Sequence, residues 1–217
     1  MSCTESTVPV KCLKCQAELA SPIVCTGCRT LYPPPQSADY FDLLGLQRNY
    51  VIDESQLTAA VRAISRKIHP DRFADQPPEM RKLATRLSAE VNQAMTVLKD
   101  PAQRAAYMLE LAGGPSAAEV RDVPGDLLAE VMVLREQIDE AQSSQDAEPV
   151  EQMRSSIQAR RTQALKQIAS RADQLAAHSD EEKKEFRRLL NSLKYFDNLL
   201  EQLAADPLAQ ASGADNG

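Results

Sequence analysis

The chain has 217 residues, of which 43% are hydrophobic and only 4% aromatic, with seven glycines and no tryptophan. With a mean hydropathy of −0.39, this composition favours a helical globular protein of one or two domains and argues against a β-sandwich or barrel. No apolar run reaches the roughly 18 residues that cross a bilayer, and the first residues show no signal or transit pattern, so we expect a cytoplasmic protein without a membrane partner. A count of only two histidines argues against a His-based metal site or catalytic triad.

Charge is distributed unevenly along the chain, whose net formal charge is −6. Residues 1–38 carry a net charge of +1, residues 39–112 are balanced, and residues 113–217 carry −7. The sequence pI near 5.1 argues against general nucleic-acid binding, which needs a strongly basic face. The charge therefore favours a protein partner or a local basic patch.

Four of the five cysteines form two C-x2-C pairs separated by nine residues: Cys12, Cys15, Cys25 and Cys28. Each pair can hold one ion from a tight turn, in which we expect Gly27 to supply a positive φ. Four thiolates leave no open position, so we predict a structural zinc ion that stands in for the core that residues 1–37 are too few to form. The alternatives are rubredoxin-like iron or two disulfides, the latter typical of secreted proteins. Cys3 is left as a free thiol.

Residues 38–112 predict four helices. Asp39 caps the first, short helix, and Asp53 opens the second, which ends where a proline follows. The third starts after Pro77-Pro78, and Asp100 with the proline after it opens the fourth. The second and third helices carry matching apolar stripes, so we expect them to pack as an antiparallel hairpin.

The tripeptide His69-Pro70-Asp71 lies in the loop of this hairpin, directly after a basic helix face. Together these features resemble a J domain, the module that triggers ATP hydrolysis in DnaK-type chaperones, over about residues 38–112. The resemblance implies that the tripeptide contacts the chaperone. It also implies a basic patch that steers the encounter, formed by Arg62, Arg66 and Lys67. Without the resemblance, His69 is a helix cap, Asp71 a turn residue and the basic residues a solvated face.

Four strings carry a more specific resemblance: DYFDLLGL from Asp39, HPDRFA from His69, VNQA from Val91 and LKDPAQRAAYML from Leu98. They resemble the HscB family of iron–sulfur cluster biogenesis co-chaperones, in which Arg-Ala-x-Tyr, here ending at Tyr107, is a signature. Core packing is the alternative role of that tyrosine.

The four cysteines resemble the N-terminal extension of mitochondrial animal-type members of the HscB family. Because no transit pattern precedes them here, we expect a bacterial protein of the longer type in preference to one of the mitochondrial matrix.

Residues 126–205 predict three amphipathic helices in a bundle, after a linker at 113–125 and before a disordered tail at 206–217. A polar turn is expected from Ser143 to Pro149. A capping box that starts at Ser179 opens the third helix. HscB proteins pair a J domain with such a bundle.

The resemblance implies that the bundle binds the iron–sulfur scaffold protein of IscU type through an exposed apolar patch with a charged rim. The matching positions are Leu128, Ala129, Met132, Val133, Glu136 and Tyr195. The alternative is that these side chains widen the buried stripe of the bundle.

The sequence thus predicts an all-α chain, with a zinc module at 1–37, a J domain at 38–112 and a three-helix bundle. We expect a co-chaperone without an active site of its own. It delivers an IscU-type scaffold protein to a DnaK/HscA-type chaperone and stimulates the ATPase of that chaperone. The alternatives are a general J protein with another client and a zinc-ribbon nucleic-acid-binding protein.

Overall fold

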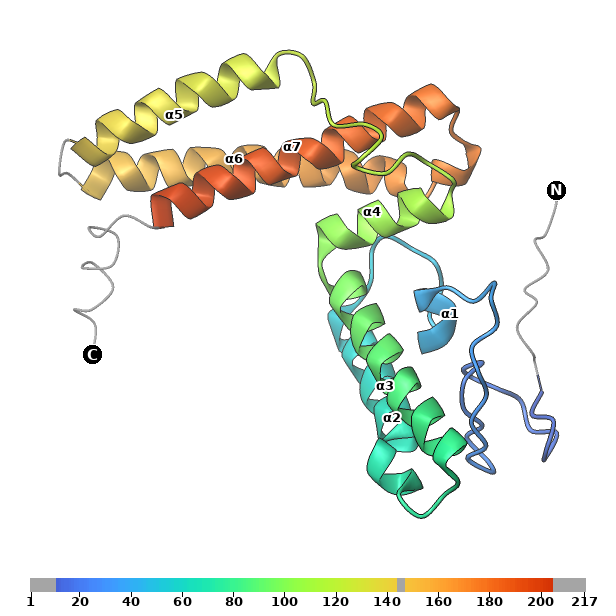
Figure 1. The fold of residues 1–217 in the computed structure, drawn as a ribbon. Coiled ribbons are helices and arrows are strands. Elements are labelled where there is room, and N and C mark those ends of the chain that lie inside the picture. The colour runs from blue at the N-terminus through green and yellow to red at the C-terminus, as the bar shows by residue number, and fades with distance from the viewer. Residues whose placement is uncertain (1–10, 144–146, 205–217) are drawn as a thin grey trace. The chain divides into compact units, whose positions relative to one another are not determined.

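The computed structural model describes residues 11–143 and 147–204 (Figure 1). Cys3 and the predicted tail at 206–217 lie outside the described residues. Within them the regular structure is helical apart from two isolated β-bridges, which confirms the predicted all-α class. Residue contacts divide the chain into two units, Met1–Arg104 and Ala105–Gly217, and each unit is described by itself.

The first unit contains the segment that carries the four cysteines (residues 11–37, the cysteine segment) and a helical hairpin. Its helices are α1 (Tyr40–Leu44), α2 (Glu54–Ile68), the 3-10 turn η1 (Pro70–Phe73), α3 (Pro78–Lys99) and the start of α4 (Pro101–Leu111). As predicted, α2 and α3 pack side by side and antiparallel, with η1 at the tip (Figure 1). The buried residues follow helical spacing, at intervals of four or seven positions on α2 and of three or four on α3: Leu57, Ile64 and Ile68 on α2, and Ala84, Leu87, Val91, Ala94 and Leu98 on α3.

Helix α1 is closed at both ends by side-chain and backbone bonds. Asp39 and Asp42 form a capping box, in which the Asp42 N–H donates to Asp39 at 2.8 Å and the Asp39 N–H donates back at 3.1 Å. Arg48 also pairs with the buried Asp39 carboxylate. Gly45 ends the helix in the left-handed conformation, with φ of 66°.

The second unit contains the end of α4 and, as predicted, a bundle of three helices. They are α5 (Leu127–Ser143), α6 (Ala147–Ala172) and, after the short turn η2 (Leu175–Ala177), α7 (Asp180–Ala204). The predicted capping box is present at the start of α7, where the Ser179 N–H donates to Glu182 at 2.7 Å. The polar turn expected up to Pro149 is wrong at its end, because α6 already begins at Ala147. A proline in the first turn costs no hydrogen bond there, since those N–H groups have no intrahelical acceptor.

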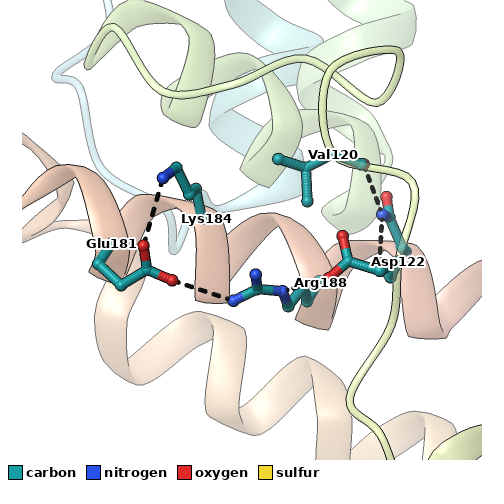
Figure 2. Close-up of polar contacts among 6 residues, drawn as sticks. Val120, Asp122, Glu181, Lys184 and Arg188 are labelled. Atoms are coloured by element: carbon teal, nitrogen blue, oxygen red, sulfur yellow. Dashed lines mark hydrogen bonds and ion pairs between the residues drawn. The ribbon is translucent and has the colours of Figure 1, made fainter.

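The segment predicted as a linker lies along α7 within this unit. The Asn191 side-chain amide donates to the carbonyls of Val120 and Asp122, both at 2.9 Å. Arg188 donates to the Asp122 carboxylate at 2.6 Å and to Glu181 at 3.3 Å (Figure 2). Val123, in the same stretch, is buried. The segment is therefore fixed to the bundle by α7.

No helix in the described part of the chain is long and apolar enough to cross a bilayer.

We predict that Gly45→Ala destabilises its unit more than Gly113→Ala destabilises the other. Both glycines have positive φ, 66° and 70°, where an alanine costs about 1–2 kcal/mol. A Cβ on Gly45 would also lie 2.3 Å from the carbonyl oxygen of Ala20, whereas one on Gly113 would meet nothing within 4 Å. Native-state hydrogen exchange measures the opening free energy of each unit. Equal losses for the two variants would show that the Ala20 contact does not matter.

Candidate functional site

The four predicted cysteines lie together at the end of the first unit. Their Sγ atoms are all within 4.8 Å of one another, with Cys12 and Cys28 at 3.4 Å and Cys15 and Cys25 at 3.5 Å. A tetrahedral ion with bonds of about 2.3 Å to sulfur needs sulfurs about 3.8 Å apart, which is close to these distances. All four are free thiols, so the structure does not contain the two disulfides of the alternative. The cluster can hold one metal ion.

The two C-x2-C turns have the same backbone geometry. The residue after each second cysteine, Gln16 or Arg29, is in the left-handed conformation, with φ of 58° or 60°. Its N–H donates to the carbonyl of the first cysteine at 2.9 or 3.1 Å. The expectation that Gly27 supplies the positive φ is therefore wrong, because the chain reverses one residue after the pair. Gly27 instead donates its N–H to Cys25 Sγ at 3.3 Å.

Two hydroxyl groups next to the cluster were not predicted. The Tyr32 hydroxyl lies 3.1 Å from Cys12 Sγ and lowers the pKa of that thiol to about 6. The Thr30 hydroxyl lies 3.1 Å from Cys28 Sγ and lowers the pKa of Cys28. Both hydroxyls favour the thiolate, which is the form that binds a metal. The only signal in the sequence was their position two and four residues after the last cysteine.

Within the first unit, the cysteine segment is packed against α1. The buried Ser21 hydroxyl donates to the carbonyl of Leu43 at 2.8 Å. Ile23 and Val24 are also buried, so the segment has a small apolar underside. The two C-x2-C turns are therefore anchored to the helical part of the unit.

The predicted tripeptide forms the tip of the α2–α3 hairpin. Pro70 ends α2 and starts η1, so that His69 is the last residue before the turn. The Asp71 N–H donates to His69 Nδ1 at 3.4 Å, which orients the ring. The side chains remain exposed, His69 at 57% and Asp71 at 88%. His69 thus caps the turn, as the simpler interpretation expected, and still presents its ring to a partner.

The predicted basic residues lie on the helix that leads to this tip. Arg62 and Arg66 are exposed and one turn apart on α2. Lys67 is half-buried and lines a hollow together with Arg72 and Phe73. The three predicted cations therefore divide between an open helix face and a hollow beside η1.

The predicted patch on α5 is exposed. Leu128, Met132 and Val133 are 50%, 66% and 51% exposed, whereas their neighbours Leu127 and Val131 are buried. The first three therefore do not widen the core of the bundle. Ala129 and Glu136 are also exposed on α5, and Tyr195 is half-buried on α7.

Arg104 of the predicted signature has a structural position. Its guanidinium donates to the carbonyl of Leu98 at 2.8 Å and lies 5.1 Å from the ring centroid of Tyr50. Burial lowers the pKa of Arg104. This side chain joins the end of α3 to the loop before α2, and Tyr107 of the same signature is half-buried.

Two family models match consecutive parts of the chain. The DnaJ domain matches residues 39–107, and the HSCB C-terminal oligomerisation domain matches residues 123–204. The chain belongs to the HscB family of co-chaperones. The DnaJ model shows a J domain in this chain, and its curated relatives are named as co-chaperones.

Known HscB proteins resemble the chain over different shares of its length. The co-chaperone protein HscB homolog of Azoarcus sp. (strain BH72) is 37% identical over 53% of this chain and 66% of its own length. The iron–sulfur cluster co-chaperone protein HscB homolog of Arabidopsis thaliana is 34% identical over 72% of this chain and 60% of its own. The Mus musculus protein HscB is 28% identical over 91% of this chain and 82% of its own. The chain thus spans about two thirds or less of the first two relatives.

Solved structures of HscB proteins have the same fold. The human co-chaperone HscB superposes with a TM-score of 0.70 at 24% identity, covering 89% of this chain and 96% of the human one. The chaperone HscB from Vibrio cholerae gives a TM-score of 0.65 at 28% identity, covering 77% of this chain and 96% of its own. The arrangement of a J domain followed by a helical domain is therefore that of HscB.

We predict that Tyr32→Phe weakens metal binding by about tenfold or more, because removing a group that orients a ligand typically costs 10- to 100-fold in affinity. All four thiols stay in place in this variant. Competition between the protein and a chelator for Zn²⁺ measures the change. Tyr195→Phe, in the other unit, is the control. Equal affinity of the Tyr32 variant and the wild type would show that the hydroxyl does not support the thiolate.

Proposed function

We propose that this chain binds an iron–sulfur scaffold protein of IscU type, delivers it to a DnaK/HscA-type chaperone and stimulates the ATPase of that chaperone. The observation that carries the proposal is the presence of two separate exposed surfaces on one chain. One is the His69–Asp71 turn, and the other is the apolar face of α5. A binding protein that brings a client to a chaperone needs both surfaces.

The chaperone contact needs no chemistry from this chain. The His69–Asp71 turn is held at the end of a packed hairpin and keeps its side chains exposed. The exposed Arg62 and Arg66 lead up to the turn and can attract an acidic surface of the chaperone. ATP hydrolysis takes place in the chaperone, and this chain changes its rate by binding.

We assign the scaffold contact to α5 because its exposed apolar side chains lie on consecutive turns of this helix. Leu128 and Met132 are four residues apart and Glu136 follows at the same interval, which gives an apolar patch with a charged end. Tyr195 adds a half-buried aromatic side chain from α7. Apolar patches with a polar rim are typical of protein interfaces.

For the cysteine cluster we propose structural zinc. Four thiolates would close the coordination sphere, so the ion would hold the two C-x2-C turns together and would have no open position for a substrate. Rubredoxin-like iron is the alternative, since it accepts the same four sulfurs.

We predict that His69→Gln abolishes stimulation of the chaperone ATPase and leaves scaffold affinity unchanged. The glutamine cannot reproduce the imidazole at the tip, and the bundle lies in the other unit. The same exchange at the other histidine, His178→Gln, is the control and retains stimulation. Steady-state ATP hydrolysis is measured with chaperone, scaffold and each variant. A His69 variant that stimulates like the wild type would refute the J-domain mechanism.

We predict that Leu128→Ala with Met132→Ala weakens scaffold binding by about 10- to 100-fold, since losing two interface side chains costs roughly 1–3 kcal/mol. The bundle stays folded, because both side chains are already exposed. Val51→Ala removes an exposed apolar side chain from the other unit and is the control. Titration calorimetry with the scaffold measures affinity. If wild-type protein stimulates the chaperone and yet does not bind the scaffold, it is a general J protein with another client.

A further inference from the structure

A cationic pocket lies beside the His69–Asp71 turn. It has a volume of about 370 Å³ and is lined by Arg29, Lys67, Arg72, Phe73 and Gln76. No acidic side chain contributes to its lining. Among the described residues, none of the three cations forms an ion pair. The charge of the pocket is therefore available to a negatively charged group from outside the chain.

Arg29 comes from the cysteine segment, while the other lining residues come from the end of α2, η1 and the loop after it. Its backbone has φ of 60° and its N–H donates to the carbonyl of Cys25 at 3.1 Å. The second C-x2-C turn thus fixes the backbone position from which the Arg29 side chain extends. The Ser21–Leu43 hydrogen bond then holds the segment on α1.

The pocket is contiguous with the tripeptide. Lys67 precedes His69 by two residues, and Arg72 directly follows Asp71. A partner that covers the exposed tripeptide therefore also reaches the mouth of the pocket. Phe73 adds an apolar wall, against which the methylene groups of a long acidic side chain can pack.

We propose that the cysteine segment is part of the chaperone-binding surface: Arg29 completes, with Lys67 and Arg72, a pocket that receives an acidic side chain of the Hsp70-type chaperone. This inference rests on the proposed function and adds to it a role for the cysteine segment in binding the chaperone. A protein carboxylate fits better than a nucleic-acid backbone, because the pocket holds three cations on a chain of net charge −6, whereas nucleic-acid binding needs an extended basic face.

The test compares charge reversals at two positions of the cysteine segment in the full-length protein. Arg29→Glu places a negative charge in the pocket. Lys14→Glu makes the same change of net charge at an exposed residue that does not line the pocket. Arg29→Asn removes the charge with a residue that tolerates the left-handed backbone. All variants are compared at equal bound zinc, so that a loss of metal cannot explain a difference.

Stimulation of the chaperone ATPase is titrated with each variant at low salt. We expect the concentration for half-maximal stimulation to rise about tenfold or more for Arg29→Glu and less for Arg29→Asn, because a carboxylate would then face a carboxylate. The maximal stimulation and the scaffold affinity of both Arg29 variants remain as in the wild type. Lys14→Glu also titrates like the wild type. The difference between Arg29→Glu and wild type shrinks as salt is added.

The inference is overturned if Arg29→Glu titrates like the wild type, or if Lys14→Glu shows the same loss and net charge alone is responsible. It is also overturned if the Arg29→Glu protein loses maximal stimulation without a change in the half-maximal concentration. Failure of the proposed function is a different result: the wild type would not stimulate the chaperone, or His69→Gln would stimulate it fully.

Discussion

The packing of α2 against α3 is the constraint on which the proposed chaperone-binding surface depends. The two apolar stripes bury residues from Leu57 to Ile68 on one side and from Ala84 to Leu98 on the other. Each fully buried Leu, Ile or Val side chain contributes about 1.5–3 kcal/mol, and this burial extends along α2 to Ile68, next to the tip. Pro70 then forces the chain out of α2, and the turn bond from Asp71 orients His69. A partner therefore meets the tripeptide in one preformed conformation, without a large cost for ordering it.

The cysteine cluster has a different structural role, in the segment before α1 of the same unit. The segment before α1 has few apolar side chains, so it cannot be stabilised by a core alone. Four thiols within 4.8 Å, with hydroxyl and backbone donors around them, provide an ion site in its place. Because this small module is anchored on α1 next to the hairpin, its outer turn can contribute Arg29 to the surface beside the tripeptide.

The second unit separates its core from its exposed apolar face. On α5 the buried and exposed apolar residues alternate as the helix turns, with Leu127, Val131 and Leu134 inside and Leu128 and Met132 outside. The stretch before α5 is held on α7 by Arg188 and Asn191 (Figure 2). This stretch is therefore part of the bundle's own structure, although its composition is that of a linker.

The sequence by itself determined the elements and motifs, because their causes are local. Capping at Asp39 and Asp53, the helix break at Pro70 and the spacing of the cysteines all act within a few residues, and the structure contains each of them. The tertiary structure alone decided which side chains meet across the chain: Tyr32 with Cys12, and Arg29 with Lys67 and Arg72. It also decided that Leu128 and Met132 lie outside the core. These outcomes depend on which faces of helices and turns are covered by packing, and no periodicity within one segment specifies that.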